Sequence, residues 1–113
     1  MKIEHYSWGQ IGINGQTYTS DVIIYPDRVV SSWWRKEGHN LNIEDLKDVI
    51  DAKPEAVVIG TGALGVMKVP EETKSYLQSK GIEVYAERTG KAVEMFNRLG
   101  EDKTVIAALH LTC

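Results

Sequence analysis

Apolar residues form two uninterrupted runs in the second half of the chain. One covers residues 56–59 (Ala-Val-Val-Ile), and the other covers residues 105–109 (Val-Ile-Ala-Ala-Leu). Apolar runs without polar alternation are typical of strands that are buried on both faces of a sheet. A third segment, residues 82–86 (Ile-Glu-Val-Tyr-Ala), is rich in β-branched and aromatic side chains, which favours a strand there as well. The sequence therefore predicts strands near residues 56–60, 82–86 and 104–110, and the first of them should be central.

Segments with helical periodicity lie before and between these strands. Near residues 43–52, apolar side chains recur every three or four positions after Asn42, a residue type that caps helices well. A proline and two glutamates open a second helix near residues 70–80. A third helix is predicted near residues 90–99, with Thr89 as its cap. Strands that alternate with helices indicate helices packed against a sheet, with right-handed crossovers between parallel strands.

The first half of the chain is rich in β-structure and turn residues. Asn14-Gly15 has the composition of a tight type I′ turn, which would join strands at residues 11–13 and 17–18. A further strand is predicted at residues 21–25, and Pro26-Asp27 favours a turn into another at residues 29–34. The chain is therefore expected to be a mixed α/β protein, and its length of 113 residues fits a single domain that spans 1–113.

The central apolar run ends in a glycine-rich loop. Gly60-x-Gly62-x-x-Gly65 matches the dinucleotide-binding fingerprint, and Glu83 or Glu87 lies at about the distance of the ribose-binding acid. In that motif, however, the glycines open a helix, whereas here four residues precede the proline of the next helix. Three interpretations remain open: dinucleotide binding, binding of another anion or small ligand, and a structural turn. The candidate ligand-binding residues are Gly60, Thr61, Gly62, Gly65 and Lys68.

Residues with metal-binding or nucleophilic side chains are few. His39, His110 and Cys113 do not have zinc-site spacing, because His110-x-x-Cys113 is a single pair. That pair has the elements of an activated thiolate, but the sequence shows neither an orienting acid nor an oxyanion hole near it. We therefore predict no metal site, no catalytic residue and no cofactor.

Trp33-Trp34-Arg35 is the most unusual composition in the chain. Neighbouring residues of a strand point to opposite faces, so one indole should enter the core and the other should lie near the surface beside an exposed Arg35. Aromatic residues and arginine are enriched at binding hot spots. We therefore predict that Trp34, Arg35 and His39 contact a partner protein or a second copy of the chain. The alternative is an aromatic cluster that seals one edge of the sheet.

The overall composition excludes several other classes of function. The net charge of −3 and the isoelectric point near 5.6 do not provide the basic surface that nucleic-acid binding requires. There is neither an apolar stretch long enough to span a membrane nor the pattern of a signal peptide. The only cysteine, Cys113, is expected to be a free thiol in a reducing compartment. These features predict a cytoplasmic protein that binds neither nucleic acid nor membranes.

Several short motifs occur in a fixed order along nearly the whole chain. They are Ser7-Trp8-Gly9-Gln10, Trp34-Arg35, Gly38-His39, Val58-Ile59-Gly60-Thr61-Gly62, Thr89 with Ala92, Phe96-Asn97 and Leu99, and Ala107-Ala108 with His110 and Cys113. This ordered set resembles a domain family that contains prokaryotic hypothetical proteins, an adipogenesis-associated cytoplasmic protein of animals and a mitochondrial complex I assembly factor. The Trp-Arg stretch and the His-x-x-Cys ending are most similar to the adipogenesis-associated branch.

The resemblance implies a three-layer α/β fold. Its central mixed sheet would contain about five strands flanked by helices, with an additional layer formed by an N-terminal β-hairpin. The family has no established catalytic residue or cofactor, so the resemblance assigns no role to individual positions. Two functional hypotheses follow. The chain is either a noncatalytic protein-binding or assembly-assisting module, or a small-molecule- or anion-binding enzyme that uses the Gly60–Gly65 loop.

Overall fold

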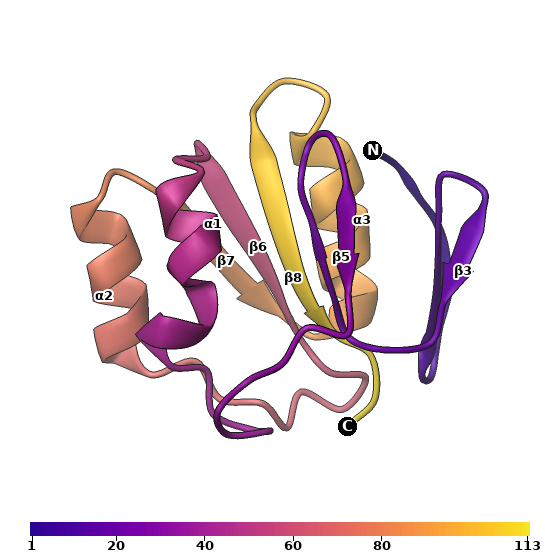
Figure 1. The fold of residues 1–113 in the computed structure, drawn as a ribbon, viewed down its shortest axis with the longest axis horizontal. Helices are drawn as coiled ribbons and strands as arrows, with labels where there is room; N and C mark the ends of the chain where they lie inside the picture. Colours follow the sequence, from indigo (N-terminus) through magenta and orange to yellow (C-terminus); the bar gives the residue numbers. More distant parts are fainter.

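The computed structural model describes all of residues 1–113 and contains two sheets (Figure 1). The strands are β1 (Ile3–Ser7), β2 (Gln10–Ile13), β3 (Gln16–Tyr18), β4 (Val22–Ile24), β5 (Val29–Ser31), β6 (Ala56–Thr61), β7 (Glu83–Glu87) and β8 (Val105–His110). The helices are the 3-10 helix η1 (Ile43–Leu46), α1 (Lys47–Asp51), α2 (Glu71–Ser79) and α3 (Thr89–Leu99). Strands β1 to β3 form an antiparallel sheet of their own.

The other five strands form a mixed sheet in the order β5-β4-β8-β6-β7. β6 is parallel to β7 and to β8, whereas β4 is antiparallel to β8 and β5. Because Val22 of β4 pairs with both Leu109 of β8 and Ser31 of β5, the start of β4 and the end of β5 lie where the parallel strands end. We call this side of the sheet the carboxyl edge. In Figure 1 it is the lower edge, close to the C-terminus.

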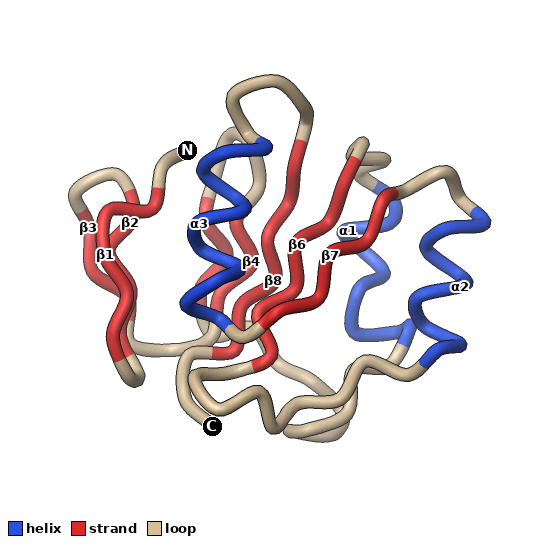
Figure 2. Tube along the Cα trace, turned by 180° about the vertical axis from the view of Figure 1, so that it is seen from behind, coloured by secondary structure: helices blue, strands red, loops and turns tan.

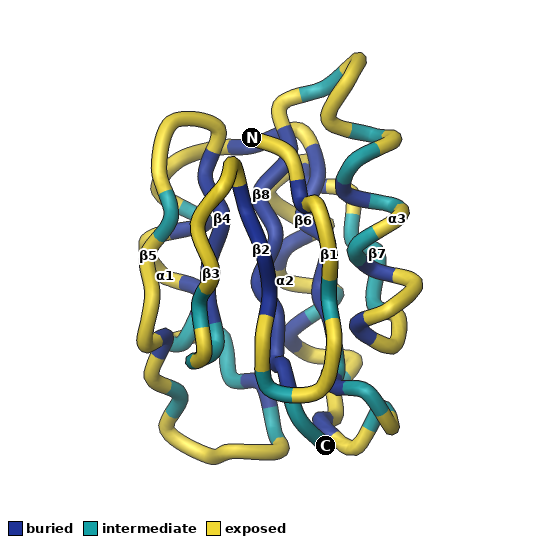
Figure 3. Tube along the Cα trace, turned by 90° about the vertical axis from the view of Figure 1, so that its right-hand side faces the viewer, coloured by how far each residue is buried: buried dark blue, intermediate teal, exposed yellow.

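Each face of the five-stranded sheet is covered by a different layer (Figure 2). On one face, alternate residues of β4, β6 and β8 form a core with α3 and with Ile3, Ile11 and Ile13 of the three-stranded sheet. On the other face, the intervening residues pack with Leu46, Val49 and residues of the α2 region. In Figure 3, β2 is buried along most of its length and β3 is mostly exposed. The small sheet covers the core through Ile3, Ile11 and Ile13, with Tyr6 and Tyr18 packed beside them. The molecule therefore has three layers.

The predicted strands near residues 56–60, 82–86 and 104–110 and the predicted helices near residues 70–80 and 90–99 are confirmed, and each boundary differs by at most one residue. The helix predicted near residues 43–52 is present as the 3-10 helix η1 followed by the short helix α1. The mixed central sheet of five strands, its flanking helices and the extra β-layer are confirmed as well. The predicted hairpin turn is present, because Asn14 and Gly15 have φ angles of 48° and 82°, as a type I′ turn requires. No helix has the combination of length and apolar character that crossing a membrane requires.

Two local predictions were wrong. Residues 29–34 do not form one strand, because Ser32 has a φ angle of 58° and β5 ends at Ser31. Thr89 does not cap α3; it is the first residue of the helix, and its hydroxyl binds the backbone of two other segments instead. In both cases a tertiary contact competes with the local signal. Ser32 N donates to the hydroxyl of Ser20 (2.9 Å), and the Thr89 hydroxyl is bonded to Gly62 N and His110 O.

Candidate functional site

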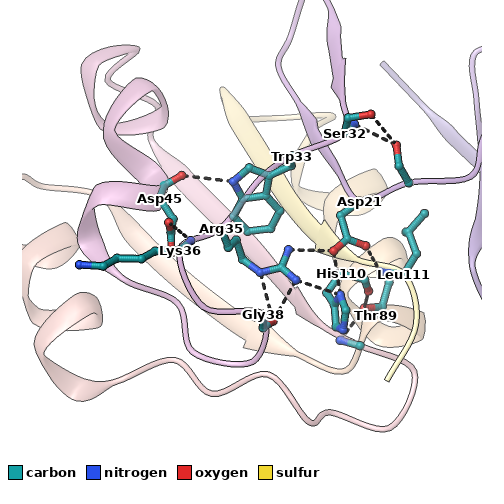
Figure 4. Close-up of polar contacts among 12 residues, drawn as sticks. Asp21, Ser32, Trp33, Arg35, Lys36, Gly38, Asp45, Thr89, His110 and Leu111 are labelled. Carbon is teal, nitrogen blue, oxygen red and sulfur yellow. Dashed lines mark hydrogen bonds and ion pairs between the residues drawn. The ribbon is translucent and has the colours of Figure 1, made fainter.

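A buried polar network lies at the carboxyl edge and is centred on Asp21 (Figure 4). Asp21 immediately precedes β4, and its Oδ2 accepts hydrogen bonds from Arg35 Nη1 and His110 Nδ1, each at 2.8 Å. Its Oδ1 accepts a third bond from the backbone N–H of Leu111, also at 2.8 Å. The network therefore joins the start of β4, the segment after β5 and the end of β8.

The electrostatics of the network favour an ionised carboxylate. Burial by itself would raise the pKa of Asp21, but hydrogen bonds from His110, Leu111 and Arg35 outweigh it and lower the pKa to about 2. The side chain of Arg35 is only 6% exposed, and its guanidinium also donates to the carbonyl of Gly38 (2.9 Å from Nη2). The charge of Arg35 is therefore compensated inside the protein.

The bond to Asp21 sets the tautomer of His110. A ring nitrogen 2.8 Å from a carboxylate oxygen must donate to it, so Nδ1 carries the proton. Arg35 Nη2 lies 3.2 Å from the same nitrogen, and this contact is between two donors in that tautomer. His110 Nε2 is buried and has no hydrogen-bond partner. Asp21 thus supplies the orienting acid that the sequence did not reveal, but Nε2 is enclosed by the protein.

The segment after β5 holds two tryptophans in opposite environments, as predicted. Trp33 is 8% exposed, and its Nε1 donates to the carbonyl of Asp45 (3.2 Å). Trp34 is 76% exposed. Arg35 differs from its prediction, because it is not exposed; its guanidinium lies 4.7 Å from the ring centroid of Trp33 and extends inward to Asp21. The prediction of an exposed Arg35 is therefore wrong, and its removal should destabilise the fold because it would leave the Asp21 carboxylate without its guanidinium partner.

His39 lies next to this network but does not belong to it. Its ring centroid is 5.6 Å from that of His110, in an edge-to-face arrangement, and the residue is exposed. Its carbonyl accepts a hydrogen bond from Lys68 N (2.8 Å), which ties the segment after β5 to the loop after β6. Of the predicted contact residues, Trp34 and His39 are therefore on the surface.

The glycine loop after β6 wraps around the last residues of the chain. Ala63 N donates to Thr112 O (2.6 Å), and Leu64 N and Val66 N donate to Cys113 O (3.2 and 3.0 Å). Gly62 has a φ angle of 108°, and a Cβ there would collide with the backbone of Cys113. Gly62 N donates to the hydroxyl of Thr89 (2.9 Å). The amides that would bind a phosphate in a dinucleotide site are therefore bonded within the chain.

The other candidate ligand-binding residues also have partners in the protein. The hydroxyl of Thr61 donates to Glu87 O (3.1 Å), and a Cβ on Gly60 would come within 2.8 Å of the Thr89 hydroxyl. Gly65 has a φ angle of 70°, and its N–H donates to Gly62 O (3.2 Å). Lys68 has an exposed side chain, while its backbone pairs with the segment after β5. Gly62 is packed against backbone, whereas Gly60 and Gly65 are packed mainly against side chains of Leu109, Thr89 and Arg88. Ligand binding at this loop stays a prediction.

Cys113 and the histidines do not form a metal-binding cluster in the structure. No group of three or more histidine, cysteine, aspartate or glutamate side chains is placed to hold a metal ion. Cys113 is half-buried, and no hydrogen bond joins its thiol to His110. The pair His110-x-x-Cys113 therefore does not have the geometry of an activated thiolate in this structure.

Exposed apolar side chains are concentrated in the loops of the carboxyl edge. Seven large apolar side chains are exposed, and four of them lie in three of these loops: Trp8, Trp34, Leu64 and Val66. Trp8 belongs to the turn between β1 and β2, which is held at this edge by a hydrogen bond from Gly9 N to Leu111 O (2.9 Å). Hydrogen bonds therefore connect all three loops to the end of β8 or to each other.

Sequence reasoning missed Asp21 and the tertiary role of Thr89. Asp21 is separated by 14 residues from Arg35 and by 89 from His110, so no local pattern connects them. The hydroxyl of Thr89 donates to His110 O (2.6 Å) and accepts from Gly62 N, which joins the ends of β8 and β6. The only local signal was that Asp21 stands at the start of a predicted strand, and this position does not indicate a partner.

The comparisons with known proteins agree with this architecture. The family described as "Protein of unknown function (DUF498/DUF598)" matches residues 3–110. The chain belongs to this family. Among solved structures, the family member is similar to the conserved hypothetical protein PH1505 of Pyrococcus horikoshii, with 27% identity, complete coverage of both chains and a TM-score of 0.84.

Two further structures extend the comparison. An outer membrane protein of Bartonella henselae is 28% identical over 98% of this chain and 94% of its own, with a TM-score of 0.81. A Mth938-like domain protein of Bordetella pertussis is 20% identical over 97% of this chain and 85% of its own, with a TM-score of 0.76. The last similarity shows the fold alone. This DUF498/DUF598 protein therefore has the Mth938-like fold.

Proposed function

We propose that this DUF498/DUF598 protein is a noncatalytic protein-binding module whose contact surface lies at the carboxyl edge. The observation that carries the proposal is the exposure of Trp34, a large aromatic side chain between two buried neighbours. Exposed tryptophan is uncommon on surfaces without a partner and is enriched at binding hot spots. His39 and the apolar side chains of Trp8, Leu64 and Val66 extend the proposed surface.

The buried network gives this surface a rigid base. Trp33 and Arg35 anchor the segment on both sides of Trp34, through Asp45 O, Gly38 O and Asp21. A preorganised contact residue loses less conformational entropy when it binds, which strengthens association. In this proposal Asp21, Arg35 and His110 are positioning residues rather than catalytic ones.

The finer parts of the proposal rest on the motifs of the chain. The Trp34-Arg35 stretch and the His110-x-x-Cys113 ending support a place near the adipogenesis-associated branch of the family. Because the same family resemblance includes an assembly factor, we propose that the module assists the assembly of another protein in the cytoplasm. The competing function, an enzyme that binds an anion at the Gly60–Gly65 loop, would first require the hydrogen bonds to Thr112 and Cys113 to open.

The test compares crosslinking from two exposed positions. A photoreactive phenylalanine analogue replaces Trp34 in one variant and Tyr76 of α2, which is also exposed, in the matched control. We expect a discrete crosslinked protein from position 34 in native cells and none from position 76. Equal crosslinking from both positions, or none from position 34, would contradict the proposal. Sedimentation of the purified chain shows whether the partner is a second copy, in which case the chain sediments as a dimer, or another protein, in which case it sediments as a monomer.

A stability measurement separates binding from folding in the same stretch. Trp33→Ala should lower the free energy of unfolding by about 3–5 kcal/mol, because it leaves a cavity in the core. Trp34→Ala should change that free energy by less than about 0.5 kcal/mol, because the side chain is exposed. Urea titration of both variants provides the comparison. A large loss of stability in Trp34→Ala would mean that the indole is a structural residue.

A further inference from the structure

The two sheets have four edge strands, and three of them are protected against pairing with another strand. β3 and β5 are only three residues long, and Ser32, with its positive φ angle, follows β5 directly. β1 is longer, but its register shifts between Ile3 and His5. The amide of Asn97 also occupies the edge of β1, because its Oδ1 accepts from Ile3 N (2.9 Å) and its Nδ2 donates to Ile3 O (2.8 Å). Short, bulged or covered edges resist strand addition.

The fourth edge strand, β7, has none of these protections. It is the last strand on its side of the five-stranded sheet (Figure 2), and it pairs with β6 without a bulge from Glu83 to Glu87. Glu83 N donates to Glu55 O (3.0 Å), and alternate residues of a parallel strand bond to the same neighbour. Val84 and Ala86 therefore direct their N–H and C=O groups outward, and no hydrogen bond joins these groups to another part of the chain.

Side chains around β7 specify what could bind there. Val84 and Ala86 pack with the core on the α2 side, whereas Tyr85 packs with the core on the α3 side. Glu83 and Glu87 lie on the same side as Tyr85, since residues two apart in a strand share a face. On the α2 side, Gln78, Gly81, Ile82 and Val84 line a shallow groove of about 450 Å³ that also touches Glu83 and Tyr85.

Charge decides between a second copy of this chain and a different segment. If two β7 strands paired antiparallel along their whole length, each glutamate would lie opposite a glutamate of the other copy, which is destabilising. The Glu87 carboxylate has no hydrogen-bond or ion-pair partner and supplies the uncompensated charge of this strand. Glu83 is exposed, but Lys103 Nζ donates to both of its oxygens (2.9 and 3.0 Å) and the Tyr85 hydroxyl donates to Oε1 (2.6 Å). A strand with basic residues opposite these two positions would instead be attracted.

We propose that β7 is a strand-addition site for an extended segment of another protein with alternating basic and apolar residues. The basic side chains lie opposite Glu83 and Glu87, and the apolar side chains between them lie over the groove beside Val84. The backbone of the segment pairs with the outward N–H and C=O groups of Val84 and Ala86, as in other complexes in which a peptide extends a sheet. This site is separate from the carboxyl-edge surface and does not depend on the function proposed for it.

The probe for this site is a capped peptide with the central sequence Lys-Val-Thr-Val-Lys, which reads the same in both strand directions. Nitrogen-15 chemical shifts of the protein are followed during titration. We expect saturable changes that are concentrated at residues 82–87. A scrambled peptide, Val-Lys-Lys-Thr-Val, has the same charge without the alternation and should produce no saturable change there. Equal binding of both peptides, or changes centred on the loop around Trp34, would overturn the proposal.

Two variants test the backbone and charge contributions separately. Ala86→Pro removes one outward N–H and should weaken binding of the peptide at least about tenfold, while leaving the bonds to β6 in place. Glu87→Lys should weaken it about fivefold, because an attraction across the strands becomes a repulsion. Asp48→Lys on α1 makes the same charge change elsewhere and should leave binding within about twofold of the parent. If Ala86→Pro does not fold, Glu87→Lys still decides, because unchanged binding in that variant overturns the proposal.

A dilution series of the protein without peptide tests whether a second copy of the chain pairs with β7. We expect the shifts of residues 82–87 to be independent of protein concentration. Concentration-dependent shifts at these residues would show that the edge pairs with a second copy, and the proposal of a different basic segment would then be wrong.

Discussion

At the scale of single residues, the most consequential arrangement is the set of three hydrogen bonds to Asp21. The carboxylate is 18% exposed and is bound by a guanidinium, an imidazole and a backbone N–H. Removing one partner of a buried ion pair leaves an uncompensated charge, which costs more than the pair contributes. Asp21 and Arg35 therefore depend on each other, and neither can be assigned to a contact surface independently of folding.

The first prediction concerns the pH dependence that Asp21 confers on stability. Its pKa is about 2 in the folded protein, compared with an ordinary value of 3.8, so the ionised form stabilises the fold. This contribution is fully present above about pH 4 and is lost as the pH falls through the folded pKa. The difference between the two pKa values corresponds to about 2 kcal/mol in the free energy of unfolding.

Asp21→Asn should therefore flatten the decrease in stability between pH 4 and pH 2. Chemical denaturation of the parent and the variant at pH 4 and pH 2 gives the loss of stability in each protein. Comparing the two losses removes the effects of other carboxyl groups, because both proteins contain them. Asp27→Asn is a matched control, because Asp27 forms only an exposed pair with Arg28. If the parent and Asp21→Asn lose stability in parallel as the pH falls, the network does not lower the pKa of Asp21.

At the scale of elements, the loop after β6 is shaped by the end of β8 and its extension. Gly62 lies where β6, the start of α3 and residues 112–113 meet, with hydrogen bonds to Thr89 and close contact with Cys113. Glycine is needed there because of its positive φ angle and because no side chain fits. The three glycines that match a dinucleotide fingerprint thus have structural reasons: Gly62 packs against the backbone of Cys113, Gly60 against Leu109 and Thr89, and Gly65 has a positive φ angle.

The second prediction is a contrast between two glycines. Gly62→Ala should destabilise the protein by about 2–4 kcal/mol, because it combines a left-handed backbone with a collision against Cys113. Gly90 of α3 has open space where a Cβ would lie and no positive φ angle, so Gly90→Ala should be neutral or stabilise by up to about 1 kcal/mol. Thermal unfolding of both variants is the measurement. A tolerated Gly62→Ala would indicate that residues 112–113 leave the loop easily.

At the scale of the whole molecule, the polar groups of the carboxyl edge are used to hold the fold together. In open α/β sheets, ligands bind outside the carboxyl ends of the parallel strands. Here that region contains the Asp21 network, the last residues of the chain and loops with exposed apolar side chains. This arrangement supports our proposal of a contact with another protein, because the polar groups that could enclose a small ligand are bonded within the chain.

The third prediction tests that view with nucleotides. NAD, FAD or ATP at millimolar concentration should leave the melting temperature nearly unchanged, because the loop amides are already bonded to Thr112 and Cys113. A ligand at one hundred times its dissociation constant would stabilise the fold by about 2.7 kcal/mol, which is several degrees in melting temperature. A shift of that size with one of the three would support the dinucleotide-binding hypothesis.

The sequence by itself determined most of the elements, because their signals are local. It did not predict β1 (Ile3–Ser7), and β5 is shorter than the strand predicted at residues 29–34. The apolar run of residues 56–59, the Asn14-Gly15 turn and the periodicity of residues 90–99 act over a few neighbouring positions, and each was interpreted correctly. The opposite environments of Trp33 and Trp34 were also predicted, although the reasoning assumed a strand that ends earlier, at Ser31.

Only the tertiary structure decided which side chains meet at the carboxyl edge. Asp21, Arg35 and His110 come from three separate segments, and their bonds form only once β4 and β8 are paired. The same pairing buries Arg35, which composition alone suggested would be exposed, and it brings residues 112–113 against Gly62. Contacts between distant segments depend on strand order and register, and no local pattern in this sequence specifies either.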